Sequence, residues 1–287
     1  MLFGPHAFPV AIVPIEAEPI FAKAIQEWTT QSWLTNSILV SLLLVVAIVF
    51  WAQRSTRRMQ LIPVGLQNFF EFIVSSLYDF FEGIVGKHMI AKSFSLLAAL
   101  FLYILAANWF GLLPGVGSIG WKEPNGVLLP LLRPTTADMN TTIGLAIVFM
   151  IFWFIWTLQE IGAASFLKHI FGVKGGVKGA LAYSLMPIFF FVGLIEVISI
   201  LIRPVSLSLR LFGNVFAGEN LINTMISMGH TLHFPLWLAK ITSVVLPIPF
   251  YFLELLIGAL QAFVFSLLCA VYLNLSTSHD EEEAENH

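Results

Sequence analysis

Four charged residues interrupt the apolar stretch 195–220, whose sequence is IEVISILIRPVSLSLRLFGNVFAGEN: Glu196, Arg203, Arg210 and Glu219. Residues seven apart lie near one face of a helix, so Glu196, Arg203 and Arg210 are nearly aligned. Asn214, one turn after Arg210, joins that face. Glu219 lies on roughly the opposite side of the helix, about 13.5 Å beyond Arg210 along the axis. One helix therefore presents a cation on one side and an acid on another.

A second apolar stretch, near the end of the chain, carries Glu254 and Gln261 seven residues apart and hence nearly aligned. In the first stretch, Asn223 follows Glu219 by one turn and can share its face. Antiparallel packing of the two stretches would bring Gln261 near Arg210. The same packing would bring Glu254 near Glu219.

A charged side chain near the middle of a bilayer costs about 2.5–3.5 kcal/mol on insertion scales, so these residues need partners or water. The guanidinium of Arg210 keeps its proton and acts as a permanent positive charge. It would favour the ionised form of a carboxylate that another subunit carries past it. Glu219 and Glu254 could deliver protons from outside, and Glu196 could release them inside. Arg210 would then separate two half-channels and prevent a short circuit of the gradient.

Internal ion pairs that hold a helical hairpin together are the alternative reading of these charges. The region holds more polar side chains than two salt bridges need, among them Ser199, Ser206, Ser208, Asn214, Asn223, Thr224 and Ser227. This excess favours a pathway over a purely structural role. Arg203, beside Pro204, fits structural pairing with Glu196 or snorkelling at least as well as a transport role.

The composition predicts a polytopic membrane protein. Of the 287 residues, 58% are hydrophobic and 11% charged, and the mean hydropathy is +0.87. The net charge of −3 suggests no attraction to nucleic acid. The single cysteine, Cys269, excludes a disulfide framework or a multi-cysteine metal site, and His230 and His233 lack further ligands at metal-binding spacing. We therefore expect no metal and no cofactor, and no cleaved signal peptide, because the apolar run 3–13 is broken by prolines and has no basic residue before it.

The elements that position these residues are predicted to be about five membrane-crossing helices in an all-α fold. The apolar runs are 35–52, 94–113, 143–158, 181–228 and 234–275. The last two exceed the ~30 Å hydrocarbon thickness about twofold, so they must tilt or break, for instance at Pro204, Pro247 or Pro249. We expect them to pack as a hairpin. Stretch 64–84 predicts an amphipathic helix in the inner interface rather than a span.

Loops and charges give the predicted orientation. Stretch 114–134 is rich in Gly and Pro, and Thr135 or Thr136 can cap a helix that starts around Asp138. Basic residues gather at the inner ends of the spans: Arg54, Arg57, Arg58, Lys87, Lys92, Lys168, Lys174 and Lys178. Four lie outside: Lys23, Lys122, Arg133 and Lys240. The positive-inside rule then places the N-terminus outside and the C-terminus inside.

Three parts follow from this topology. Residues 1–34 form an outer arm, 35–275 a single transmembrane domain with the hairpin 180–275 as its core, and 276–287 an acidic cytoplasmic tail that includes HDEEEAENH.

The chain resembles subunit a of the F-type ATP synthase, the stationary membrane subunit beside the rotating ring of c subunits. The resemblance centres on PVSLSLRLFGNVFAGE, residues 204–219, and LQAFVFSLLCAVYL, residues 260–273. Weaker similarity covers NWFGLLPG, residues 108–115, and PTTADMNTT, residues 134–142.

This resemblance implies that Arg210 is the essential arginine that faces the ring carboxylate, with Gln261 and Asn214 beside it. It implies that Glu219 belongs to the outer half-channel and Glu196 to the inner one. Position 254 varies within the family and is an acid here. Nearby acids titrate as a coupled pair, so it stays open whether Glu219 or Glu254 is the titrating group of the outer half-channel.

The resemblance also implies partners and a location. The partners are c-ring subunits, b-type peripheral stalk subunits, membrane lipid and protons, with no catalytic ATP site in this chain. The location is the bacterial inner membrane. A Na⁺-translocating version of the same subunit stays open, because the ion site would lie mostly on the ring. A secondary transporter would predict a repeat of the broken, charged helix in the first half, and none is found. A membrane-embedded enzyme lacks its motifs here, and a purely structural scaffold leaves Arg210 and Glu219 unexplained.

Overall fold

A computed structural model describes residues 36–57, 59–60, 63, 65–113, 116, 120–122, 128–130, 132–172 and 180–277. The predicted outer arm 1–34 and nearly all of the predicted tail 276–287 lie outside the described residues. The predicted boundaries of the transmembrane domain at 35–275 stay a prediction.

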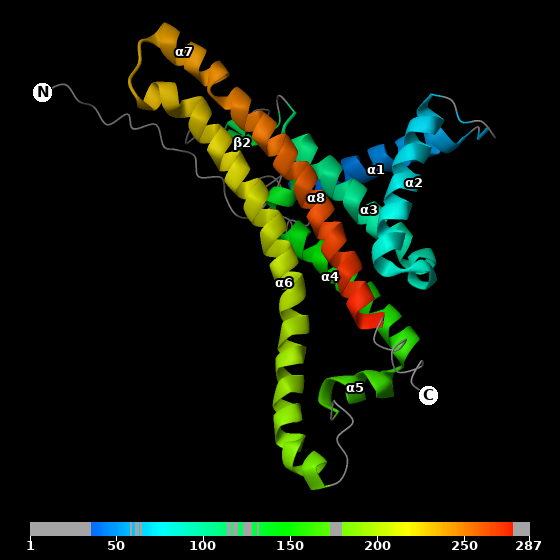
Figure 1. The fold of residues 1–287 in the computed structure, drawn as a ribbon. Helices are drawn as coiled ribbons and strands as arrows, with labels where there is room; N and C mark the ends of the chain where they lie inside the picture. The colour runs from blue at the N-terminus through cyan, green and yellow to red at the C-terminus, as the bar shows by residue number, and fades with distance from the viewer. Residues whose placement is uncertain are drawn as a thin grey trace, which may run out of the picture. The chain divides into compact units, whose positions relative to one another are not determined.

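Helices dominate the described residues (Figure 1). They are α1 (Asn36–Thr56), α2 (Leu66–Val85), α3 (Lys87–Gly111), α4 (Met139–Ile161), α5 (Ala163–Phe171), α6 (Ala180–Thr231), α7 (Leu236–Val245) and α8 (Pro247–Thr277), with a 3₁₀ turn η1 (Thr135–Ala137). Within the described part of the chain, five helical segments are long and apolar enough to cross a membrane. They are Ser37–Thr56, Lys87–Gly111, Met139–Ile161, Met186–Thr231 and Leu236–Ser276. These segments confirm the predicted all-α polytopic class.

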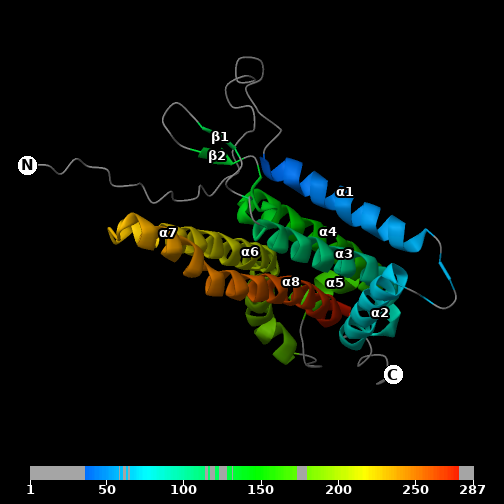
Figure 2. The same cartoon turned by 90° about the horizontal axis from the view of Figure 1, so that it is seen from above.

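The loop predicted at 114–134 contains two short strands that the sequence analysis did not anticipate. Strands β1 (Gly120–Lys122) and β2 (Leu128–Pro130) pair antiparallel, with Trp121 opposite Leu129 (Figure 2). The helix after the loop begins at Met139, and its cap differs from the prediction. Asp138 Oδ1 accepts the backbone N–H of Asn140 at 3.0 Å, so Asp138, rather than Thr135 or Thr136, caps α4.

The two long apolar segments differ in whether their helix is continuous. Helix α6 runs unbroken for 52 residues, about 78 Å at ~1.5 Å per residue, with Pro187 and Pro204 inside it. The second segment is interrupted at a single residue, because α7 ends at Val245 and α8 begins at Pro247, and Leu246 between them keeps helical dihedral angles. Proline suits the first position of a helix, where its missing N–H would have no helical partner.

Helix α2 confirms the predicted helix at 64–84. Glycines flank it, and both have a positive φ that favours glycine: 64° at Gly65 and 85° at Gly86. Phe81 and Val85 are buried, whereas Phe69 and Phe72 are exposed. Its place in the inner interface stays a prediction.

The residues group into two compact units, which are described separately. The first unit consists of Met1–Trp51, Leu102–Thr141 and Leu211–Phe263, and the second of Ala52–Phe101, Thr142–Arg210 and Val264–His287. In the first unit, Val40, Leu44 and Ala107 form a buried cluster of α1 and α3. Beside it, the hydroxyls of Ser41 and Tyr103 lie 2.7 Å apart.

The first unit also contains the outer part of the predicted hairpin. The second half of α6 runs beside α7 and the first half of α8 (Figures 1 and 2). Gly229 of α6 packs so closely that an added Cβ would lie 3.0 Å from the Ala239 Cα. A turn at His233, whose φ is 55°, joins the two arms. This packing confirms an antiparallel hairpin in this unit.

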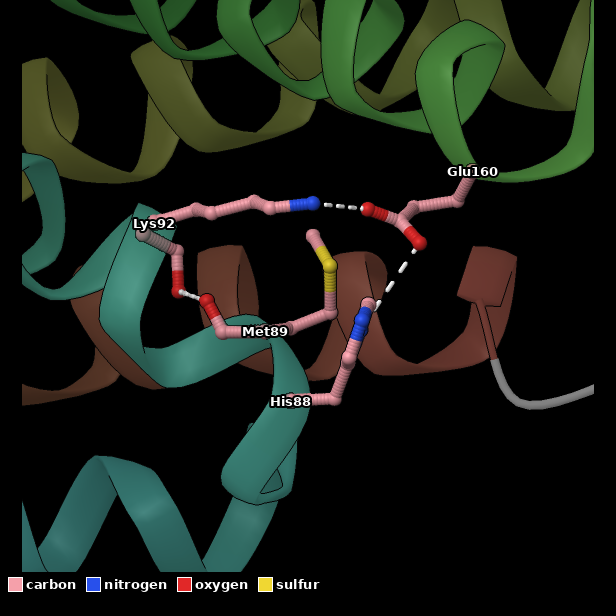
Figure 3. A network of polar contacts seen from close by, with 5 residues as sticks. His88, Met89, Lys92 and Glu160 are labelled. Atoms are coloured by element: carbon pink, nitrogen blue, oxygen red, sulfur yellow. Dashed lines mark hydrogen bonds and ion pairs between the residues drawn. The ribbon is translucent and has the colours of Figure 1, made fainter.

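In the second unit, α4 packs against α8 through Trp153, whose indole N–H donates to the Tyr272 carbonyl at 3.0 Å. Helix α5, which the sequence analysis did not predict, packs on the start of α6, where Phe171 stacks on Phe190 with ring centroids 5.6 Å apart. Glu160 at the end of α4 contacts the side chains of Lys92 and His88 of α3 (Figure 3). Lys92 donates to one carboxylate oxygen, and His88 Nδ1 lies 3.7 Å from the other.

Candidate functional site

Arg210 lies on the exposed side of α6 in the second unit. The side of the helix that carries Ser208, roughly opposite Arg210, is packed, because Ser208 is 1% exposed and its hydroxyl lies 3.0 Å from that of Thr142 on α4. Leu207, one turn before Arg210, is also buried, at 2% exposed. Among the described residues, Arg210 makes no hydrogen bond or ion pair. Its guanidinium is therefore held at the surface by a packed helix and is open to a partner on another chain.

Asn214 and Gln261 meet in the first unit, where the Asn214 side-chain amide donates to the Gln261 carbonyl oxygen at 2.6 Å. Asn214 is exposed, whereas Gln261 is only 4% exposed. The Nε2 group of Gln261 has no hydrogen-bond partner among the described residues. The contact links α6 to α8 at the positions that the antiparallel pairing requires. The predicted proximity of Gln261 to Arg210 stays a prediction.

Glu219 faces Arg133, a residue that the sequence analysis counted only as an outer-loop charge. Arg133 Nε lies 3.9 Å from Glu219 Oε2, and the two side chains are 2% and 19% exposed. Arg133 Nη2 also donates to the Ala137 carbonyl at 3.4 Å, so the 3₁₀ turn helps to hold the guanidinium. The signal that could have revealed Arg133 is its position in LLRPTT, between apolar residues and a helix start.

Glu254 lies on α8 with 9% of its surface exposed. Its carboxylate packs directly on Gly218 of α6, because a Cβ added to that glycine would overlap the carboxyl group. Glu254 therefore approaches the segment of α6 that carries Glu219, as antiparallel packing predicts. Gly218 was not singled out from the sequence.

Asn108 connects two elements of the first unit. Its Nδ2 donates to the Gly258 carbonyl on α8 at 3.0 Å, and its Oδ1 accepts from the Thr136 hydroxyl at 2.8 Å. Gly258 permits the close approach, since an added Cβ would lie 3.1 Å from the Asn108 Cβ. These bonds fix α8 and the 3₁₀ turn, and with them the surroundings of Glu254 and Arg133.

The remaining candidates lie elsewhere on α6. Asn223 is exposed in the first unit, and Glu196 is half-buried in the second. Arg203, also in the second unit, places its guanidinium 4.9 Å from the Tyr272 ring centroid and 5.7 Å from that of Trp153. Such cation–π contacts favour a structural role for Arg203. Across the described residues, no group of three or more His, Cys, Asp or Glu side chains is placed to hold a metal ion.

Comparison with known proteins identifies the family of the chain. Residues 35–274 match the family model described as ATP synthase A chain. Subunit a of the ATP synthase from Solidesulfovibrio magneticus is 32% identical over 82% of this chain and 81% of its own length. The same subunit from Trichlorobacter lovleyi is 32% identical over 80% of this chain and 81% of its own length. The subunit from Moorella thermoacetica is 31% identical over 76% of this chain and 80% of its own length.

A family match across nearly all of the helical region, together with relatives that align over about four fifths of their length, shows that the chain belongs to the ATP synthase subunit a family.

Proposed function

We propose that this chain is the stationary, proton-translocating subunit of the ATP synthase membrane sector, and that it couples proton flow to rotation of a neighbouring c-ring and to ATP synthesis. The observation that carries the proposal is Arg210: a permanent cation on the exposed side of a membrane-crossing helix, without a partner among the described residues. A carboxylate on another subunit is the natural counter-charge for such a group.

The outer half-channel is assigned to the polar side chains of Arg133, Glu219 and Glu254 in the first unit. Glu219 and Glu254 take up protons from outside, with Asn223 on the exposed side of α6 beyond them. Arg133 faces Glu219, and its positive charge offsets part of the cost of burying the ionised carboxylate, so that the acid can hold a proton transiently rather than permanently.

Arg210 separates the two half-channels. A ring carboxylate that passes Arg210 is held in its ionised form and gives up its proton, which leaves through the inner half-channel past Glu196. The exposed Asn214, one turn after Arg210, keeps a polar group on the ring-facing side of α6, and its amide donates to the buried Gln261. The guanidinium cannot relay a proton, so protons cross only by riding on the ring.

The partners follow from the same assignment. The chain works in a complex with other ATP synthase subunits, and we assign c-ring subunits to the Arg210 side and b-type peripheral stalk subunits to the remainder of the lipid-embedded surface. ATP chemistry belongs to other subunits, so this chain is non-catalytic. The bacterial relatives and the five candidate spans among the described residues support a bacterial membrane protein. We assign it to the inner membrane, with its N-terminus outside and its C-terminus in the cytoplasm.

Disulfide cross-linking tests the ring contact directly. Leu209, next to Arg210 on α6, is 47% exposed, whereas Leu207, three residues before Arg210, is 2% exposed. In a Cys269→Ala background, Leu209→Cys should cross-link to a cysteine placed beside the ring carboxylate, whereas Leu207→Cys should not. Equal cross-linking of both variants, or of neither, would contradict a ring surface centred on Arg210.

The coupling ion is tested on the assembled complex. A proton-coupled ring carboxylate should react with a carbodiimide at the same rate with and without Na⁺. Protection by Na⁺ would identify the Na⁺-translocating alternative instead.

A further inference from the structure

A pocket of about 420 Å³ lies between the end of α1 and one face of α2 in the second unit. Its volume falls in the range of about 300–1,000 Å³ that is usual for small-molecule sites. It lies apart in sequence from every residue assigned to the proton pathway, so it requires its own explanation.

The α2 side of the pocket is acidic. Glu71 and Asp79 line it, with Ser75 between them at helical spacing, so that the three side chains share one face. Glu71 and Asp79 make no side-chain hydrogen bond or ion pair with any other described residue. Two carboxylates that face one cavity without a counter-charge are suited to a cationic group with several N–H donors.

The α1 side contributes a buried hydroxyl. Ser55 lines the pocket, is only 6% exposed, and its Oγ has no hydrogen-bond partner within the described ranges. Buried hydroxyls in proteins are nearly always hydrogen-bonded, and leaving one unsatisfied is unfavourable. A polar ligand atom in the pocket would satisfy it.

Met59, Phe70 and Val74 form the apolar part of the wall, and Thr56, Gln67 and Tyr78 complete it. The pocket adjoins the end of membrane-crossing α1, where Arg54 is exposed and lies next to Ser55 in the chain. Cationic side chains at a span's end attract lipid phosphates.

We propose that this pocket binds the headgroup of an aminophospholipid, with the primary ammonium on Glu71 and Asp79, the phosphate toward Arg54, and the upper acyl chain against Met59 and Phe70. The proposal uses the predicted place of α2 in the membrane interface and is independent of the proton pathway. A quaternary ammonium has no N–H to donate, and an anionic lipid without an amine is repelled by the two carboxylates. Phosphatidylethanolamine is therefore preferred over phosphatidylcholine and phosphatidylglycerol.

Native mass spectrometry of the assembled, delipidated complex tests this preference by titration with each of the three lipids. The wild-type complex should retain one phosphatidylethanolamine at a concentration about tenfold below that needed for the other two, the difference expected from loss of one charge-assisted contact. Equal retention of phosphatidylethanolamine and phosphatidylcholine would overturn the proposal.

Matched variants locate the site. Glu71→Gln combined with Asp79→Asn should abolish the preference, while Glu82→Gln, on the same helix but outside the pocket lining, should keep it. An unchanged preference in the double variant would contradict binding at this pocket. Retention of O-phosphoethanolamine, which has no acyl chains, at a concentration as low as that of phosphatidylethanolamine would show that a soluble amine occupies the pocket and would overturn the assignment to a lipid.

Discussion

Arg133 and Glu219 face each other in the first unit, with Nε and Oε2 3.9 Å apart and the arginine side chain 2% exposed. The distance is longer than a direct hydrogen bond and makes the contact an ion pair that neutralises charge without locking the carboxylate. An acid that must release a proton repeatedly benefits from such a partner, because its ionised form is stabilised while its oxygens remain available.

Removal of Arg133 should disturb both stability and pumping. Arg133→Ala leaves the half-buried Glu219 carboxylate without its counter-charge. Removing one partner of a buried ion pair typically destabilises a protein by about 3–5 kcal/mol. We expect less of the subunit in membranes and weak ATP-driven proton pumping. Arg133→Gln combined with Glu219→Gln should restore the amount of subunit but not the pumping. The control is Lys240→Gln, an exposed residue of α7, and equal loss in this control would contradict the pairing.

Arg210→Ala should abolish ATP-driven proton pumping while the complex assembles normally. The side chain is exposed and has no partner among the described residues, so its removal leaves no buried group unsatisfied. The measurement is fluorescence quenching in inverted vesicles, with the subunit quantified in the same membranes. Pumping at the wild-type level would refute the assignment of Arg210 as the barrier.

Arg203→Ala serves as a contrast on the same helix. Its guanidinium contacts the rings of Tyr272 and Trp153, and a desolvated cation–π contact is worth about 2 kcal/mol. We expect a lower thermal stability of the purified complex, with pumping per assembled complex close to wild type. A complete loss of pumping in fully assembled complexes would instead make Arg203 a pathway residue.

Gly218→Ala should impair the outer half-channel. The new methyl group would collide with the Glu254 carboxylate, and overpacking of this kind costs about 1–3 kcal/mol. Gly213→Ala is the matched control, because a Cβ there meets no atom within 4 Å. Adding Glu254→Ser to Gly218→Ala should recover thermal stability. If Gly213→Ala and Gly218→Ala change stability equally, the collision with Glu254 is not responsible.

The hydrogen bond between Asn214 and Gln261 is measurable by a double-mutant cycle. Side-chain hydrogen bonds between membrane helices contribute about 0.6 kcal/mol on average and up to about 1.7. Asn214→Ala, Gln261→Ala and the double variant should therefore be non-additive by that amount in thermal stability. Strict additivity would mean that the two amides act independently.

Most of the helical framework is predictable from hydropathy, because each span is a long apolar run with clear ends. The cluster around Glu219 is only partly predictable. Helical spacing identifies the positions on α6 and α8, and antiparallel pairing anticipates the approach of Glu254. Arg133 escapes prediction because it lies in a loop, where no periodicity indicates which residues will be buried.

Two other features depend on tertiary context. The sequence offers prolines in both long segments and therefore a break in either. Helix α6 continues through Pro187 and Pro204, whereas the chain interrupts its helix before Pro247. The contact of Gly218 with Glu254 likewise depends on how closely two helices approach, which no local pattern reports.

The continuity of α6 through Pro204 leaves a backbone hydrogen-bond acceptor without a helical donor. Proline supplies no N–H, so the carbonyl of Ile200 has no donor four residues on within the helix. Ile200 itself lies one turn after Glu196, on the same face. The helix therefore carries a backbone acceptor beside that acid, which gives water a second point of attachment where a departing proton would need one.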